Sequence, residues 1–257
     1  MAAFDSYDNV LAQIASGYRL SLPFWGEIQT ATVAFGGNVS SHQRIATIAV
    51  PSLPGGLTHI LPTRISAVAS NSNAPQSLLI AKATLLGTLN IGTGAYTDGS
   101  SMPTMTEAGS SRAVPGTIML EVTTALNATP GSVTVKYVDQ AGNAAETAPI
   151  IALPASAPAG SAGCVLLNSG DFGATDLDAT LGLVQSGGTS PTGIIKAYGI
   201  QPIFLVPLLG ALIGSIRSNL SPTFQPVKLL GGDSIAVYVL ANTLVGSAFG
   251  NIYCAAE

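Results

Sequence analysis

Short runs of β-branched and other apolar residues, each followed by a turn, limit the fold of this chain more than any other feature. The run 132–138 is the clearest example, because Val133, Val135 and Tyr137 alternate there with the residues between them, and the turn sequence 139–143 follows. An alternation of period two is typical of a strand that buries one face. Further strands are expected at 45–50, 77–89, 117–123, 164–167, 179–184, 193–198, 203–206, 234–240 and 249–254.

Turn residues separate these runs, and their frequency indicates the fold class. The chain has 29 glycines and 16 prolines, the residue types that most often interrupt strands and form turns. The apolar run 77–89 fits either one long strand or two. Many short strands joined by such turns predict an all-β fold of the jelly-roll or β-sandwich type.

The N-terminal part of the chain follows a different pattern. Residues 5–17 carry a cap residue, an apolar stripe and a final glycine, which predict a short helix. The extended stretch 18–25 follows and carries the only tryptophan. We therefore expect an N-terminal arm with a short helix over 1–28 and a β-sandwich or jelly-roll body over 29–257.

A low-complexity stretch of Pro, Ala, Ser and Gly interrupts the body at 154–163. This composition fits a linker that subdivides the body into two halves, and it also fits a long surface loop. The surface loop is the favoured interpretation.

Charged residues make up only 9% of the chain, against about 25% in an ordinary soluble domain. Interface cores are depleted of Lys, Glu and Asp, so a surface largely covered by other subunits explains the deficit. A free surface made polar by Ser, Thr, Asn, Gln and Gly is the alternative. The net charge is −4 and basic residues form no run, which argues against nucleic-acid binding.

Neither a targeting segment nor a membrane span is expected. Residues 1–8 show no basic region followed by an apolar one, so we expect synthesis without export. The most apolar stretch, 200–216, is broken by two prolines and two glycines, and its uninterrupted runs are too short to cross a bilayer.

The residues that catalysis needs are scarce. His42 and His59 are the only histidines, neither stands in a recognisable motif, and no Gly-x-Ser-x-Gly sequence occurs. Asp171, Asp176 and Asp178 form the only acidic cluster; they lack an EF-hand pattern, and turn formation explains them better than calcium binding. We therefore expect no enzyme activity, no cofactor and no metal site.

The two cysteines, Cys164 and Cys254, are far apart in the sequence and match no metal-binding or redox spacing. Two buried thiols are the favoured interpretation. A disulfide between them fits the sequence as well.

The middle of the chain is similar to a known class of structural protein. Residues 117–150, with the sequence from Pro130 to Asn143 at their centre, resemble a β-rich virion structural protein of tailed bacteriophages. In those proteins a Pro-rich loop and an apolar Gly-Asp segment follow, which here correspond to 157–160 and 167–173. The resemblance implies a non-enzymatic component of the virion.

The end of the chain is similar to a second class. Residues 227–239 and 247–253 resemble the last strands of trimeric jelly-roll heads related to complement C1q and tumour necrosis factor. In such heads a Gly-Asp turn precedes an alternating strand, and the final strand lies centrally near the three-fold axis. The resemblance implies a homotrimer, but it implies no receptor-binding role, because a fold does not determine a function.

Together these patterns predict a virion structural protein, most specifically a capsid decoration (cement) protein that stabilises a phage head and is assembled in the host cytoplasm. The expected partners are further copies of the chain and the major capsid protein or another virion protein, without nucleic acid or membrane. Phe24 and Trp25 are the expected anchors of the partner interface, because aromatic side chains dominate interface energetics, and core packing is the alternative for both. A tail, neck or fibre component and a glycan- or receptor-binding module are the alternative functions.

Overall fold

The structure is a computed structural model that describes residues 19–28, 42–53, 60–69, 76–107, 110–144, 146–187, 192–208, 227–240 and 246–256. The long elements in these segments are all β-strands, which confirms the expected all-β fold. Within the same segments, no helix has the length and hydropathy to cross a membrane. The helix expected at 5–17 lies outside the described residues.

The strands are β1 (Arg19–Ile28), β2 (His42–Ala49), β3 (Ile60–Ala69), β4 (Gln76–Asn90), β5 (Tyr96–Asp98), β6 (Thr104–Glu107), β7 (Ser110–Ala113), β8 (Thr117–Thr124), β9 (Ser132–Asp139), β10 (Glu146–Thr147), β11 (Ile151–Ala152), β12 (Ser161–Cys164), β13 (Ala174–Leu177), β14 (Leu183–Ser186), β15 (Ile194–Leu208), β16 (Ser234–Leu240) and β17 (Gly246–Ala256). Every pairing between them is antiparallel. Antiparallel strands need only short connections, in agreement with the many turn residues.

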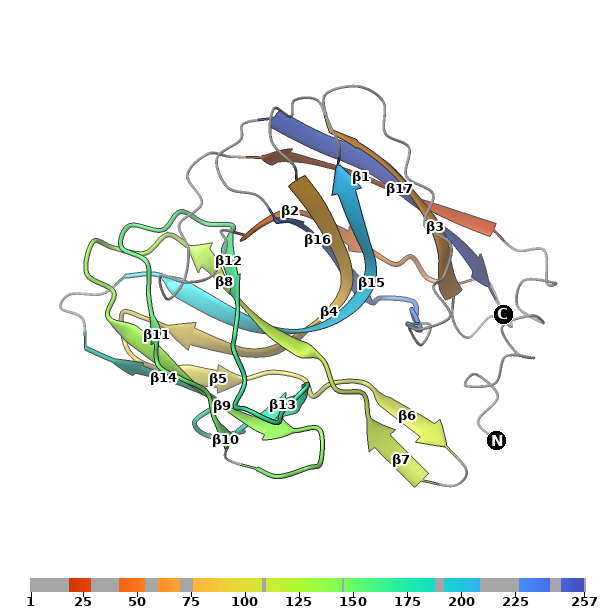
Figure 1. Ribbon diagram of the computed structural model, residues 1–257. Coiled ribbons are helices and arrows are strands. Elements are labelled where there is room, and N and C mark those ends of the chain that lie inside the picture. The colour runs from red at the N-terminus through yellow and green to blue at the C-terminus, as the bar shows by residue number, and fades with distance from the viewer. Residues whose placement is uncertain are drawn as a thin grey trace.

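Six strands close on themselves to form a ring, which is visible at the centre of Figure 1. Their order is β15–β8–β12–β2–β16–β4, and the pairing of β4 with β15 completes the circle. These two strands have 15 residues each and pair from Gln76 opposite Leu208 to Asn90 opposite Ile194. The run 77–89 is therefore part of one long strand.

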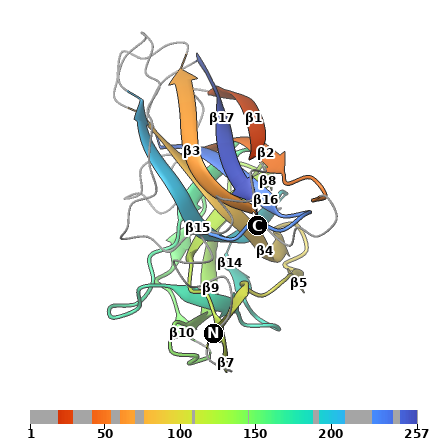
Figure 2. The same cartoon turned by 90° about the vertical axis from the view of Figure 1, so that its right-hand side faces the viewer.

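A three-stranded sheet, β1–β17–β3, packs against one side of the ring, and we name it sheet A. Its strands lie at the opposite end of the molecule from β9 and β10 (Figure 2). The core between sheet A and the ring contains Leu22, Phe24, Ile48, Val50, Ile60, Ile65, Ala67, Leu78, Ile80, Phe204, Val206, Leu229, Ile235, Val237, Val239, Ala248, Ile252 and Cys254. This pair of layers forms a β-sandwich.

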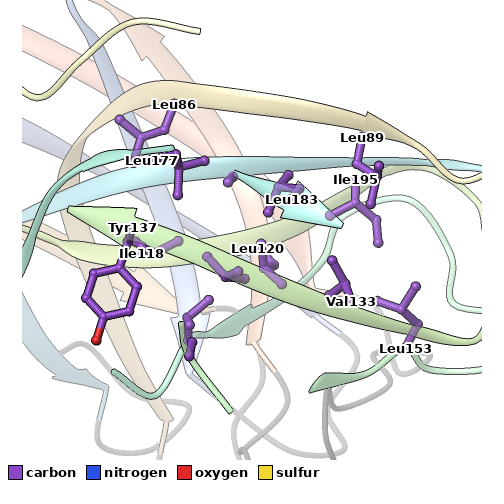
Figure 3. Close-up of a cluster of buried hydrophobic side chains, with 14 of the residues drawn as sticks. Leu86, Leu89, Ile118, Leu120, Val133, Tyr137, Leu153, Leu177, Leu183 and Ile195 are labelled. Carbon is purple, nitrogen blue, oxygen red and sulfur yellow. The ribbon is translucent and has the colours of Figure 1, made fainter. Parts of the chain in front are cut away.

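A second sheet is centred on β9 and covers another part of the ring. β10, β11, β13 and β14 all pair with β9. Val133, Val135 and Tyr137 on β9 are fully buried, in one cluster with Leu120 of β8 and Ile195 of β15 (Figure 3). The period-two alternation expected for β9 is thus confirmed. The β9 sheet and the ring together form a second sandwich.

The interior of the ring holds a third, separate cluster. Ala81, Ala83, Ala162 and Ala236 supply much of it, and the larger Tyr238 fills the space that these small side chains leave. A closed sheet of six strands has little room inside, so small residues must alternate with large ones there.

The stretch Arg19–Ile28, expected within the arm, is strand β1 of sheet A. Leu22 and Phe24 point into the core, and Gly26 lies so close to β2 that a Cβ there would collide with the carbonyl oxygen of Ile45. These residues belong to the body because their alternate side chains complete a buried face. The stretch 19–28 is thus part of sheet A, and the arm before Arg19 stays a prediction.

Turns and irregular backbone occupy the low-complexity stretch 154–163 up to residue 160, and only its last three residues belong to a strand. Ala157 is fully buried, and Ser161–Cys164 forms β12 between β8 and β2. Its small residues are needed because β12 borders the crowded ring interior. The strand expected at 164–167 is therefore shifted to the preceding residues.

The expected strands 193–198 and 203–206 are a single strand, β15, although Pro202 interrupts the sequence between them. A register shift accommodates the proline, and from Gln201 onward β15 pairs with β4 alone. Proline has no backbone N–H group to donate, and it is tolerated where one edge of the strand has no partner strand. Residues 179–182 form a turn, so the strand expected at 179–184 begins only at Leu183.

Candidate interaction surface

The side of sheet A that faces away from the ring carries the most prominent exposed aromatic pair of the described residues. Trp25 on β1 is 60% exposed and Phe249 on β17 is 46% exposed, and the two residues are direct partners in the strand register. We name this side the outer face; its members on the two strands are Arg19, Ser21, Pro23, Trp25, Glu27, Ser247, Phe249, Asn251 and Tyr253. Direct partners on a sheet have neighbouring side chains, so the two rings form one apolar patch.

Polar contacts hold the rest of the outer face in place. The Ser21 hydroxyl donates to the side-chain oxygen of Asn251 at 3.2 Å. The Arg64 guanidinium of β3 lies 5.1 Å from the centre of the Tyr253 ring, which is a cation–π contact. These contacts order the side chains before any partner binds, which lowers the entropy cost of association.

The charges of the outer face lie at its two ends. Arg19 begins β1 and is exposed, whereas Glu27 lies near the opposite end of the same strand and is also exposed. Arg64 of β3 pairs with Tyr253, whose other partner is Ser21, so this second cation lies toward the Arg19 end. The face is thus positive at one end, negative at the other and uncharged between them.

The two expected interface anchors lie on opposite sides of sheet A. Phe24 is 6% exposed and packs in the core, where its partner Gly250 leaves room for the ring. Trp25 points the other way, because neighbouring residues of a strand face opposite sides. Core packing therefore applies to Phe24, and a role in binding stays a prediction for Trp25 alone.

Sequence reasoning did not single out Phe249, although it lies in an expected strand. Its proximity to Trp25 depends on a pairing between residues at the two ends of the chain, which no local pattern reveals. The period-two spacing of Leu20, Leu22 and Phe24 was a signal that could have identified β1 as a strand.

Other large apolar side chains are exposed on loops and strands that do not belong to sheet A. They are Ile150, Leu166, Phe172, Leu181, Leu205 and Leu230. Isolated exposed apolar residues are normal on protein surfaces, so none of them by itself indicates a site.

The ring interior contains a buried ion pair. Arg44 Nη1 lies 3.1 Å from Glu121 Oε2, and the Arg44 guanidinium lies 4.4 Å and 5.5 Å from the ring centres of Tyr198 and Tyr238. Burial raises the pKa of Glu121, against the opposing effect of Arg44 and Lys196. Strands surround these groups and both side chains are largely buried, so the pair is not placed to meet a substrate from solvent.

The histidines do not extend the Arg44–Glu121 pair into a catalytic arrangement. His42 is the first residue of β2, and it is buried. His59 lies outside the described residues. The absence of enzyme activity stays a prediction.

The three aspartates of the acidic cluster accept separate hydrogen bonds and do not converge on a common site. Asp171 accepts from the Tyr137 hydroxyl at 2.6 Å, Asp176 accepts from the Ser101 hydroxyl, and Asp178 accepts from two backbone N–H groups of its own turn at 2.8 and 2.9 Å. In the described part of the chain, no three His, Cys, Asp or Glu side chains are grouped closely enough to hold a metal ion.

Both cysteines are free thiols and lie in different cores. Cys254 is buried between sheet A and the ring, whereas Cys164 packs against the ring-interior cluster, with its Sγ 3.8 Å from the Sδ of Met119. The structure therefore decides between the two interpretations that the sequence left open, in favour of separate thiols.

Comparison with protein-family models gives no match, and no curated protein is similar in sequence. Two solved structures align weakly. The structure of infectious bursal disease virus Gx strain is 10% identical, covers 93% of this chain and 82% of its own, and has a TM-score of 0.21. The structure of T=1 particles derived from infectious bursal virus is 9% identical, covers 93% and 78%, and has a TM-score of 0.20. Scores this low support no conclusion about this chain.

Proposed function

We propose that this chain is a non-enzymatic structural protein of a virus particle, which acts by packing against copies of itself and against another virion protein. More specifically, we propose a capsid decoration (cement) protein that stabilises a bacteriophage head. The observation that carries the proposal is the outer face of sheet A, where the exposed side chains of Trp25 and Phe249 lie next to each other. Aromatic side chains of this kind are the usual anchors of protein interfaces.

The composition supports the same proposal. Hydrophobic residues form 47% of the chain and charged residues only 9%. A protein that works as a free monomer normally uses interspersed surface charge to stay soluble. A protein built into a particle needs less charge, because neighbouring subunits cover much of its surface.

The all-β architecture suits such a role. Two sandwiches share one closed ring of strands, so sheet A and the β9 sheet are each held by a packed core. Rigid faces lose little conformational entropy on binding, and many copies on one particle increase the effective affinity further. The trimer implied by the resemblance is one form of this assembly.

The test is binding to empty capsids assembled from the major capsid protein of the same genome. The purified full chain should co-sediment with the capsids and raise the temperature at which they disassemble. Trp25→Ser should weaken co-sedimentation at least tenfold, because it removes the aromatic anchor through which neighbouring copies hold one another on the particle. Phe172→Ser is the matched control, since Phe172 is 73% exposed but lies outside sheet A.

Two results would contradict the proposal. If the unaltered chain does not bind capsids but binds immobilised glycans, the chain is a glycan-binding module. If mass spectrometry finds it in purified tails and not in heads, it is a tail, neck or fibre component.

A further inference from the structure

We propose that the outer face of sheet A binds the same face of a second copy of this chain, related by a two-fold axis that runs across the strands. This inference rests on the proposed function in that copies of the chain pack against one another. It adds which face they use and how the two copies are oriented.

The charges of β1 carry the first step. Arg19 lies four residues before Pro23 and Glu27 lies four residues after it, and both are exposed on the outer face. At about 3.3 Å per residue, roughly 27 Å of strand separates the two charges. A two-fold axis near Pro23 reverses the strand, so it places Glu27 opposite Arg19 of the partner subunit. Symmetry then gives the same ion pair twice.

The second strand supports the same axis. Asn251 of β17 is the direct partner of Pro23, and Phe249 and Tyr253 lie two residues to either side of it. The axis that pairs the charges therefore also places Phe249 against Tyr253 of the partner subunit. Aromatic pairs of this kind add to the free energy gained from apolar burial.

A second copy fits this face better than an unrelated partner does. The face is self-complementary, since one strand carries a cation at one end and an anion at the other with a largely neutral middle. A partner with charge of a single sign would meet repulsion at one of the two ends. Isologous contacts require a surface that complements itself, and this face meets that requirement.

The size of the face sets the strength of the contact. Three strands about 4.8 Å apart and about 30 Å long give roughly 450 Å² for each copy. Stable complexes bury about 800 Å² for each partner, so the isolated dimer should be weak and should depend on concentration. Such a contact suits an assembly in which many copies are held near one another.

The experiment is sedimentation equilibrium of the full chain over a series of concentrations. The unaltered chain should show a reversible monomer–dimer equilibrium. Arg19→Glu and Glu27→Arg should each weaken the dimer about tenfold, because each turns two attractive charge pairs into repulsive ones. The double variant Arg19→Glu/Glu27→Arg should restore dimerisation to nearly its original strength. Phe172→Ser should leave it unchanged, and near-ultraviolet circular dichroism checks that each variant is folded.

Two outcomes overturn the inference. One is a double variant that associates as weakly as the single variants do. The other is an unaltered chain that stays monomeric at every concentration, or that forms a trimer whose mass neither single variant changes. If the same proteins still bind capsids, only the two-fold contact is wrong. If they dimerise as expected but do not bind capsids, the proposed function fails and the two-fold contact stands.

Discussion

Arg44 Nη1 lies 3.1 Å from Glu121 Oε2, so an ion pair joins β2 to β8 across the strand between them, β12. With four residues, β12 is the shortest strand of the ring, and it pairs with β2 through only Ser161 and Ala162. At β12 the ring is therefore bridged by a side-chain ion pair as well as by backbone hydrogen bonds. Tyr198 and Tyr238 add cation–π contacts to the same guanidinium.

Removal of the cation should destabilise the protein strongly. Arg44→Met leaves Glu121 as an unpaired buried carboxyl group and should lower the free energy of unfolding by about 3 kcal/mol. The double variant Arg44→Met/Glu121→Gln leaves no unpaired charge and should recover more than half of that loss. Urea unfolding followed by circular dichroism measures both values. If the double variant is as unstable as Arg44→Met, the contribution of the pair is packing and not charge.

Phe24 and Trp25 should respond in opposite ways, because they lie on opposite sides of sheet A. Phe24→Ala empties part of the core and should lower the free energy of unfolding by about 3 kcal/mol. Trp25→Ala should change it by about 0.5 kcal/mol or less and should instead weaken association. Thermal unfolding and sedimentation of the two variants separate these effects. A large loss of stability in Trp25→Ala would contradict the assignment of its side chain to the outer face.

Asp178 should contribute stability that depends on pH. The N–H groups of Leu181 and Thr180, with the Thr180 hydroxyl, lower the pKa of the Asp178 carboxyl below its ordinary value of 3.8. A group whose pKa is lower in the folded state stabilises the protein above its unfolded pKa, and this stability is lost as the pH falls through the folded value. Asp178→Asn cannot titrate. The original chain should therefore exceed it in melting temperature near neutral pH, and the difference should shrink below about pH 4.

The measurement is a series of melting temperatures for both proteins between about pH 2 and about pH 7. Curves that stay parallel over this range would show that the ionised carboxyl of Asp178 has no special role in the fold.

The two thiols should be unreactive in the folded protein. Burial raises the pKa of Cys254 to about 12 and also raises the pKa of Cys164, so little reactive thiolate forms near neutral pH. A thiol-reactive disulfide reagent should label neither cysteine in the native chain and both in denaturant without reductant. Failure to label either one after unfolding would indicate a disulfide, contrary to their location in separate cores.

Much of the local structure could be predicted from the sequence. The alternation at 132–138, the strand at 117–123 and the Gly232-Asp233 turn before 234–240 all correspond to observed elements. Such patterns are local, since the backbone places successive side chains on opposite faces whatever the partner strand is. The same local character explains why these runs and the turns between them predicted an all-β fold.

Pairings between distant residues could not be predicted in this way. Ser161–Cys164 has the composition of a loop, and it is a strand only because the crowded ring interior accepts small residues there. Phe24 and Trp25 are both aromatic and adjacent in the sequence. Only the pairing of β1 with β17 decides that Phe24 is buried and Trp25 is exposed. The sequence by itself therefore determined many of the strands and the low charge of the chain. The tertiary structure decided which strands close the ring and which aromatic rings face solvent, because those choices depend on pairings between residues far apart in the sequence, such as Trp25 with Phe249 and Asn90 with Ile194.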